Sequence, residues 1–159
     1  MDDLRGSERR QLTVLFCDIV DSTGLSERCD PEDLRDILLE FQAISTRCIN
    51  DAGGSVINYI GDGIRSEFGY PLASENEAEN AVRTGLLLLR AVEQLSERAV
   101  ATIKEPLRVR IGVHTGLAVI GTAAPGHWLT SADSFPDESL TIATWRRRPA
   151  AEPVGHLTP

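Results

Sequence analysis

The chain has 159 residues, of which 42% are hydrophobic and 25% are charged, and this profile is typical of one soluble domain. It excludes a collagen-like chain, a disulfide scaffold and bulk disorder. The formal net charge of -8 argues against nucleic acid or an anionic membrane as a partner, and no apolar run approaches the roughly 20 residues that span a bilayer. We therefore expect a cytoplasmic protein whose three cysteines stay reduced.

The first half of the chain predicts an N-terminal extension, a strand and a helix. Residues 1–11 have no apolar core and form the extension. The continuous apolar run over 12–20 predicts a central strand, with Asp18 near its C-terminal end. After a loop rich in Ser, Thr and Gly, the Asp-Pro pair at 30–31 opens an amphipathic helix, which the glycine pair at 53–54 ends.

The second half predicts a hairpin, a long helix and a strand. Two short β-rich runs surround a Gly-Asp-Gly turn at 61–63, which places Asp62 at the tip of a β-hairpin. A helix over about 75–100 follows, and a β-rich run over 107–120 completes the order β-α-β-β-α-β. This order indicates an α+β, ferredoxin-like fold, in which two helices cover one face of an antiparallel sheet. For the long helix, the spacing predicts a buried stripe of Ala78, Val82, Leu86, Leu89 and Val92, with Leu88, Leu95 and Ala99 beside it.

The segment 122–159 differs in kind from what precedes it. It holds five of the eight prolines and both tryptophans, and it shows no sustained period of 2 or 3.6 residues. We expect a poorly ordered tail with a short strand near 140–145, so that the folded region spans 12–121.

Two acidic residues stand where side chains leave the predicted sheet. Asp18 lies at a strand end, and Asp62 lies between two glycines that leave its carboxylate uncrowded. In a ferredoxin-like sheet the first strand and this hairpin are neighbours, so the two carboxylates can converge into a Mg²⁺ site. Two metal ions there could activate a hydroxyl group and hold a departing pyrophosphate. The alternative is a loop-capping acid and an ordinary Asp-Gly turn.

Three motifs in order resemble one family. The motifs FCDIVDST at 16–23, INYIGDG at 57–63 and VRIGVHTG at 109–116 are similar to the catalytic domain of the class III nucleotide cyclases, which are adenylate and guanylate cyclases. The similarity covers about residues 9–121 and is greatest to a bacterial branch. The family fold is the same arrangement extended by further strands and a helix, so the resemblance implies a domain that is incomplete at its C-terminus.

The resemblance implies a role for each matching residue. Asp18 and Asp62 match the two catalytic, metal-binding aspartates, which hold two Mg²⁺ or Mn²⁺ ions together with the backbone carbonyl of Ile19. Asn58 takes the base-contact position, where many adenylate-specific members have a lysine, so ATP is expected and GTP stays open. The positions that match nucleotide or phosphate contacts are Ile19, Val20, Ser22, Thr23, Gly24, Gly61 and Arg110. Asp21 stands where the family's phosphate loop usually has glycine.

The family builds its site at a dimer interface, to which one subunit gives the metal aspartates and the other gives the base-reading and transition-state residues. The second set includes an Asn-x-x-x-Arg motif on a later helix, and this chain has no asparagine after Asn80. We therefore expect a metal-binding half-site of an adenylate cyclase, a phosphorus-oxygen lyase that makes cyclic AMP and pyrophosphate from ATP. It would pair with a complete cyclase domain as a heterodimer and be very slow or inert as a homodimer.

Other functions stay open at this point. One alternative is a catalytically inactive cyclase remnant that binds nucleotide or forms heterodimers as a regulatory module. A phosphatase or phosphotransferase with an aspartate nucleophile is disfavoured, because the spacing Asp18-x-x-Asp21 is not the Asp-x-Asp that such sites usually have. His114 is expected to be a packed or half-exposed strand residue rather than a metal ligand.

Overall fold

The computed structural model describes residues 8–124, 127–129 and 142–143, with the side-chain environments of 9–118. The elements are β1 (Glu8–Ile19), α1 (Ser22–Arg28), α2 (Pro31–Asp51), β2 (Ser55–Ile60), β3 (Gly63–Phe68), α3 (Glu77–Ile103), β4 (Val109–Ala124), β5 (His127–Leu129) and β6 (Ile142–Ala143). This secondary structure follows the predicted order, with the additional short helix α1 and the additional short strand β5.

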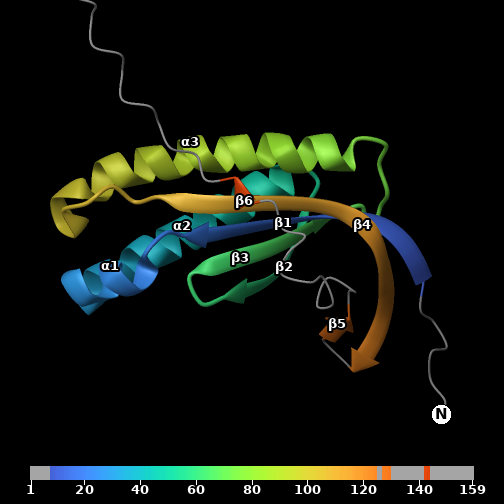
Figure 1. Cartoon of the computed structure of the whole chain (residues 1–159), viewed down its shortest axis with the longest axis horizontal. Coiled ribbons are helices and arrows are strands. Elements are labelled where there is room, and N and C mark those ends of the chain that lie inside the picture. Colours follow the sequence, from blue (N-terminus) through green and yellow to red (C-terminus); the bar gives the residue numbers. More distant parts are fainter. Residues whose placement is uncertain (1–7, 125–126, 130–141, 144–159) are drawn as a thin grey trace, which may run out of the picture.

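The strands form a sheet in the order β2-β3-β1-β4-β5, and β6 also pairs with β4, at Ile111 and Gly112. Every pairing is antiparallel. β1 therefore lies between the hairpin and β4, and the long helices α2 and α3 run alongside the sheet (Figure 1). This arrangement confirms the ferredoxin-like α+β fold that the sequence predicts.

One face of the sheet packs against both long helices. Leu15, Cys17 and Ile19 of β1 are at most 1% exposed and belong to the same core cluster as residues of α2 and α3. Because side chains alternate along a strand, the residues between them, including Asp18, lie on the opposite face. The apolar side of α2 buries Phe41 in this core, as its periodicity predicts, and the Asp30 carboxylate caps that helix.

The predicted buried stripe of α3 is wrong in its first half. Val82 and Leu86 are 50% and 55% exposed, whereas Thr84 and Gly85 are fully buried. The reason is close approach to the sheet: a Cβ built on Gly85 would lie 3.3 Å from Ile111 Cγ2. The helix turns its small residues toward the sheet, and the branched side chains next to them stay half-exposed. The residues that α3 buries are Ala81, Thr84, Gly85, Leu88, Val92, Leu95, Ser96, Ala99 and Ile103.

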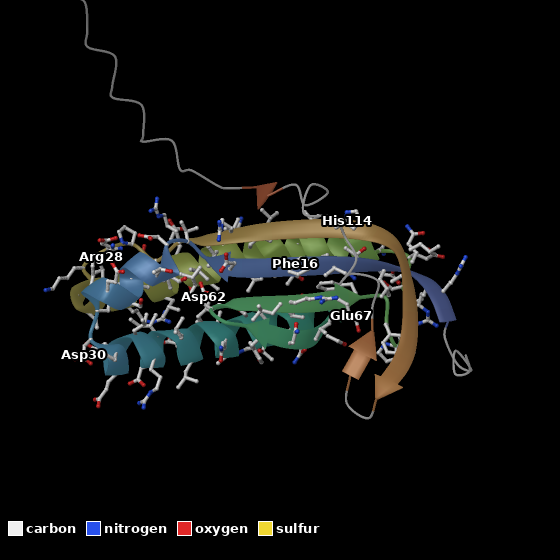
Figure 2. The ribbon with its side chains drawn as sticks, turned by 60° about the horizontal axis from the view of Figure 1, so that its bottom comes forward. Phe16, Arg28, Asp30, Asp62, Glu67 and His114 are labelled. Atoms are coloured by element: carbon white, nitrogen blue, oxygen red, sulfur yellow. The ribbon has the colours of Figure 1, made fainter. Side chains whose placement is uncertain are left out.

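The loop predicted after β1 is also wrong, because residues 22–28 form the short helix α1. Leu25, its one buried residue, donates its backbone N–H to the Asp21 carbonyl at 2.9 Å. A seven-residue helix with one apolar anchor has too little periodicity to be recognised. α1 links the end of β1 to the start of α2, beside the end of the sheet that carries Asp62 (Figure 2).

The ends of the sheet extend past the expected domain limits of 12 and 121. β1 begins at Glu8, which pairs with Ile120, and β4 continues to Ala124. β6 falls within the expected strand near 140–145. The other residues of the expected extension and tail, 1–7, 125–126, 130–141 and 144–159, lie outside the described part of the chain. Within that part, no helix combines the length and the apolar character that crossing a membrane requires.

Candidate functional site

The turn between β2 and β3 carries Asp62, as predicted. Ile60 pairs with Gly63, so Gly61 and Asp62 form a two-residue hairpin loop. The backbone φ is +60° at Gly61 and is not positive at Asp62. This sign pattern is that of a type II′ turn, which has glycine at its first central position. Gly61 therefore sets the turn, and Asp62 follows it at the end of the sheet nearest α1 (Figure 2).

Asp18 lies directly beside this turn. In the register of the sheet, Asp18 faces Gly63 of β3 on one side and Arg110 of β4 on the other. A Cβ built on Gly63 would lie 3.7 Å from Asp18 Cβ and 3.3 Å from the backbone oxygen of Cys17. The absence of a side chain at Gly63 therefore lets the hairpin turn lie against β1. The fold places Asp18, near the end of β1, and Asp62, in the turn that leads into the neighbouring strand β3, at one end of the sheet.

One oxygen of Asp62 is buried without a hydrogen-bond partner. Oδ2 has essentially no exposed area and accepts no hydrogen bond in the described part of the chain. A buried carboxylate oxygen in this condition is costly, and nearly all such atoms in proteins have a partner. Oxygen ligands that keep room for water and phosphate suit Mg²⁺ and Mn²⁺. The donor set of Asp62 and its neighbour Asp18 therefore fits a divalent cation.

A cation in this place would take only part of its ligands from side chains. No group of three or more His, Cys, Asp or Glu side chains with metal-binding geometry occurs among the described residues. Two carboxylates and a backbone carbonyl, such as that of Ile19, leave positions for water and for ligand oxygens. This open coordination is typical of Mg²⁺ that binds together with a phosphate-bearing molecule.

Arg110 forms an ion pair with Asp18. Its Nη2 donates a hydrogen bond to Asp18 Oδ2, and the two side chains are 44% and 38% exposed. Arg110 thus lies on the same face of the sheet as Asp18, next to the hairpin turn. The sequence motif places a basic residue here, but its bond to the Asp18 carboxylate was not predicted.

The loop that leads into α1 is fastened by Arg28. Arg28 Nη2 donates to Asp21 Oδ2 at 3.1 Å, and Arg28 Nε lies 2.9 Å from Glu105 Oε1. The hydrogen bond to Asp21, with the nearby charge of Glu105, raises the pKa of the Arg28 guanidinium. A Cβ built on Gly24 would come within 2.6 Å of the Asp21 carboxylate and 2.7 Å of Arg28, so glycine leaves the room that this ion pair occupies.

Asp21 begins α1 with a left-handed backbone, at φ +58°. Glycine is the residue that takes this conformation most readily, and aspartate is among the few others that tolerate it. The backbone of Asp21 is therefore in a conformation that glycine, the residue implied here by the resemblance, adopts readily. Because the Asp21 carboxylate pairs with Arg28, much of the extra negative charge in the loop is compensated.

Sequence reasoning missed Arg28 and Glu105. Arg28 is seven residues after Asp21, which is two helical turns, so their pairing could have been found if a helix had been expected there. Glu105 is 77 residues further along the chain, and no local signal connects the two.

The candidate Asn58 lies apart from this end of the sheet, as does His114, which was not expected to be a metal ligand. Asn58 is exposed on the edge strand β2, two strands away from β1, with Arg65 as its register partner. His114 is half-buried on β4, opposite Val14, and Figure 2 shows it further along the sheet than Asp62. The fold thus brings together Asp18, Gly61, Asp62 and Arg110, with Ile19 at the end of β1 and residues 20–24 after it.

A family model and two curated proteins match this chain, and all three are adenylate or guanylate cyclases. The sequence model described as "Adenylate and Guanylate cyclase catalytic domain" matches residues 5–129. The chain is 32% identical over 124 residues to "Adenylate cyclase" of Anabaena cylindrica, covering 76% of this chain and 24% of that protein. It is 30% identical over 118 residues to "Adenylate cyclase 1" of Rhizobium meliloti (strain 1021), covering 74% of this chain and 18% of that protein.

A solved structure shares the fold. The adenylyl cyclase CyaB from P. aeruginosa superposes with a TM-score of 0.73 at 29% identity, over 79% of this chain and 66% of that one. The chain spans about a quarter or less of the length of the two curated relatives.

Proposed function

Because the chain belongs to the adenylate and guanylate cyclase catalytic domain family, we propose that it supplies the metal-binding half of a nucleotide cyclase site. The substrate is ATP, and the products are cyclic AMP and pyrophosphate. Members of this family use divalent cations, bind nucleotides and commonly dimerise. The observation that carries the proposal is the buried, unpartnered Oδ2 of Asp62 beside the carboxylate of Asp18.

Each residue has a defined task in this proposal. Asp18 and Asp62, with the carbonyl of Ile19, hold two Mg²⁺ or Mn²⁺ ions. When bound, these ions lower the pKa of the ribose 3′-hydroxyl and offset the charge of the triphosphate. The residues of the chain then position the reactants. The 3′-oxygen gives its proton to water and forms a bond to the α-phosphorus, and the bond from that phosphorus to the pyrophosphate oxygen breaks.

The phosphate groups need positive charge and N–H donors from a chain whose net charge is -8. Arg110 offers a guanidinium to the terminal phosphate, and backbone N–H groups of residues 21–24 and 61 face the other oxygens. The Val20 N–H is not among these donors, because it donates to the Arg108 carbonyl at 2.8 Å. Positioning and electrostatics of this kind account for most of the catalysis in phosphoryl transfer. Asn58 stands at the base-contact position, where its amide can donate and accept hydrogen bonds, so GTP is a second possible substrate.

A complete cyclase domain is the proposed partner. No asparagine follows Asn80 in these 159 residues, so they do not contain the Asn-x-x-x-Arg motif that the family uses at the transition state. The same absence favours one other function, a nucleotide-binding module that forms heterodimers without turnover. Both functions need the metal site, and they differ in whether a partner restores the reaction.

A tethered heterodimer tests the proposal. The chain is joined by a flexible linker to the cyclase domain of the Anabaena cylindrica adenylate cyclase, in which both metal aspartates have been changed to asparagine. The linker keeps the two domains at high effective concentration. We expect cyclic AMP production from Mn-ATP, lost with Asp62→Asn in this chain and kept with Asp51→Asn, an exposed carboxylate at the end of α2.

The result also separates the two functions. If the tethered pair makes no cyclic AMP and still binds a non-hydrolysable ATP analogue with Mn²⁺, the chain is a binding module. Rapid production of cyclic AMP by the chain without a partner would contradict the proposal that it supplies only half of the site.

A further inference from the structure

The ion pair between Arg110 and Asp18 lies at the place where the proposed function needs a divalent cation. β1 and β4 put these residues opposite each other in register, and Arg110 Nη2 donates to Asp18 Oδ2. The guanidinium therefore already occupies one oxygen of a proposed metal ligand. The neighbouring Asp62 Oδ2, in contrast, has no hydrogen-bond partner among the residues that the structure describes.

The ion pair between Arg110 and Asp18 can be broken at little cost in free energy. Both side chains are more than one third exposed, so water can replace either partner, and ion pairs at such exposure are weak. Arg28 differs from Arg110 in the number of its ion-pair partners, because it pairs with two carboxylates, those of Asp21 and Glu105. Within the described residues, Arg110 has the Asp18 carboxylate as its one ion-pair partner.

A divalent cation and a guanidinium oppose each other at Asp18. The carboxylate has lone pairs for both, but two positive charges a few ångströms apart repel each other, and the cation carries twice the charge of the guanidinium. Binding of a cation at Asp18 therefore releases Arg110. The released guanidinium has no other carboxylate partner in the described part of the chain, so it can pair with an anion that arrives with the metal.

We propose that Arg110 is a positioning residue that acts as an internal cation, holding the Asp18 carboxylate until a divalent cation and a phosphate-bearing ligand arrive together. This inference rests on the proposed metal site. Arg110 lowers the affinity for the metal alone and raises the affinity for the metal with its phosphate ligand. Since such coupling is reciprocal, the ligand strengthens metal binding and the metal strengthens ligand binding.

The test measures Mn²⁺ binding to the full chain. Binding is monitored as a decrease in the electron paramagnetic resonance signal of free Mn²⁺. Four proteins are compared without nucleotide: the unchanged chain, Arg110→Gln, Arg108→Gln and Asp18→Asn. Arg108 is an exposed residue that precedes β4, and its substitution removes the same charge without touching the ion pair. We expect Arg110→Gln to bind Mn²⁺ about three to ten times more tightly than Arg108→Gln, given the strength of exposed ion pairs and the added repulsion.

The second arm adds a non-hydrolysable ATP analogue. We expect the analogue to strengthen Mn²⁺ binding in the unchanged chain and in Arg108→Gln, and to do so much less in Arg110→Gln. Equal Mn²⁺ affinity in the two arginine variants, or equal strengthening by the analogue in both, would overturn the role of Arg110.

Asp18→Asn separates failure of this inference from failure of the proposed function. If Asp18→Asn weakens Mn²⁺ binding and Arg110→Gln behaves like its control, only the role of Arg110 is overturned. If Asp18→Asn binds Mn²⁺ as the unchanged chain does, both the metal site and the inference are overturned. A fifth protein, Arg110→Lys, keeps the positive charge, so its Mn²⁺ affinity should stay near that of the unchanged chain. This variant checks that charge rather than a change in fold explains the result.

Discussion

Asp62→Asn should have opposite effects on the stability of the metal-free protein and on the response to metal. The substitution keeps the size of the side chain and suits the turn, but it removes the charge beside the buried, unpartnered Oδ2. Because a buried group without a partner is costly, we expect the free energy of unfolding in EDTA to stay equal or to rise by about 1 kcal/mol. For a chain of this size, 1 kcal/mol corresponds to about 3 °C in Tm.

Added Mn²⁺ should make the unchanged chain more stable to unfolding than Asp62→Asn, which reverses their order in EDTA. At a Mn²⁺ concentration of about 100 times the dissociation constant, a ligand that binds only the folded state adds about 2.7 kcal/mol, or about 8 °C. The unchanged chain should gain this amount, and Asp62→Asn should gain almost none. The assay is thermal unfolding followed by circular dichroism, in EDTA and in Mn²⁺. Asp51→Asn, an exposed carboxylate on α2, is the matched control and should keep the gain.

Two results would refute this reasoning. A loss of more than about 1 kcal/mol by Asp62→Asn in EDTA would mean that the carboxylate stabilises the turn, as hydrogen-bonded carboxylates do. An undiminished gain with Mn²⁺ would mean that the cation binds elsewhere.

Two further predictions follow from buried ionisable groups. Burial raises the pKa of Glu67 above its ordinary value of 4.5, partly offset by the charge of Arg65, so the folded chain holds this proton more tightly than the unfolded chain. Stability is therefore lost as pH rises above 4.5, and Glu67→Gln should be the more stable protein in urea at pH 7, with an advantage that vanishes below pH 4.5; an advantage independent of pH would contradict this. Burial, with the nearby Asp18 charge, raises the pKa of the Cys17 thiol to about 12, so at pH 8 about one molecule in ten thousand carries the thiolate. An aromatic disulfide reagent should therefore leave Cys17 unmodified in the folded chain, and loss of a fast-reacting thiol in Cys17→Ala would contradict the burial.

Local signals predicted the parts of the fold that depend on local physics. The Asp30 cap, the Gly61-Asp62 turn and the periodicity of α2 each arise from residues within a few positions of one another, and the structure has all three. The β-α-β-β-α-β order then limits the sheet topology, so the neighbourhood of Asp18 and the hairpin turn could also be predicted.

The features that the sequence did not predict depend on contacts between residues far apart in the chain. The buried side of α3 depends on how closely Gly85 approaches Ile111, and counting apolar residues along the helix favours the wrong side. The ion pair of Asp18 with Arg110 depends on the register of two strands whose paired residues are 92 positions apart. The alternation of buried and exposed residues excludes a register shift of one residue, because that shift would turn the buried side chains outward. It does not exclude a shift of two residues, which would separate Arg110 from Asp18.

The central claim is that Asp18 and Asp62 together hold the metal that lets this acidic chain bind a nucleotide triphosphate. The most direct measurement is calorimetric titration of the full chain with a non-hydrolysable ATP analogue, in Mn²⁺ and in EDTA, for the unchanged protein and for the double variant Asp18→Asn, Asp62→Asn. We predict binding by the unchanged chain in Mn²⁺ alone, and no binding by the double variant in either buffer. Binding that persists in EDTA, or equal binding by the double variant, would contradict the account.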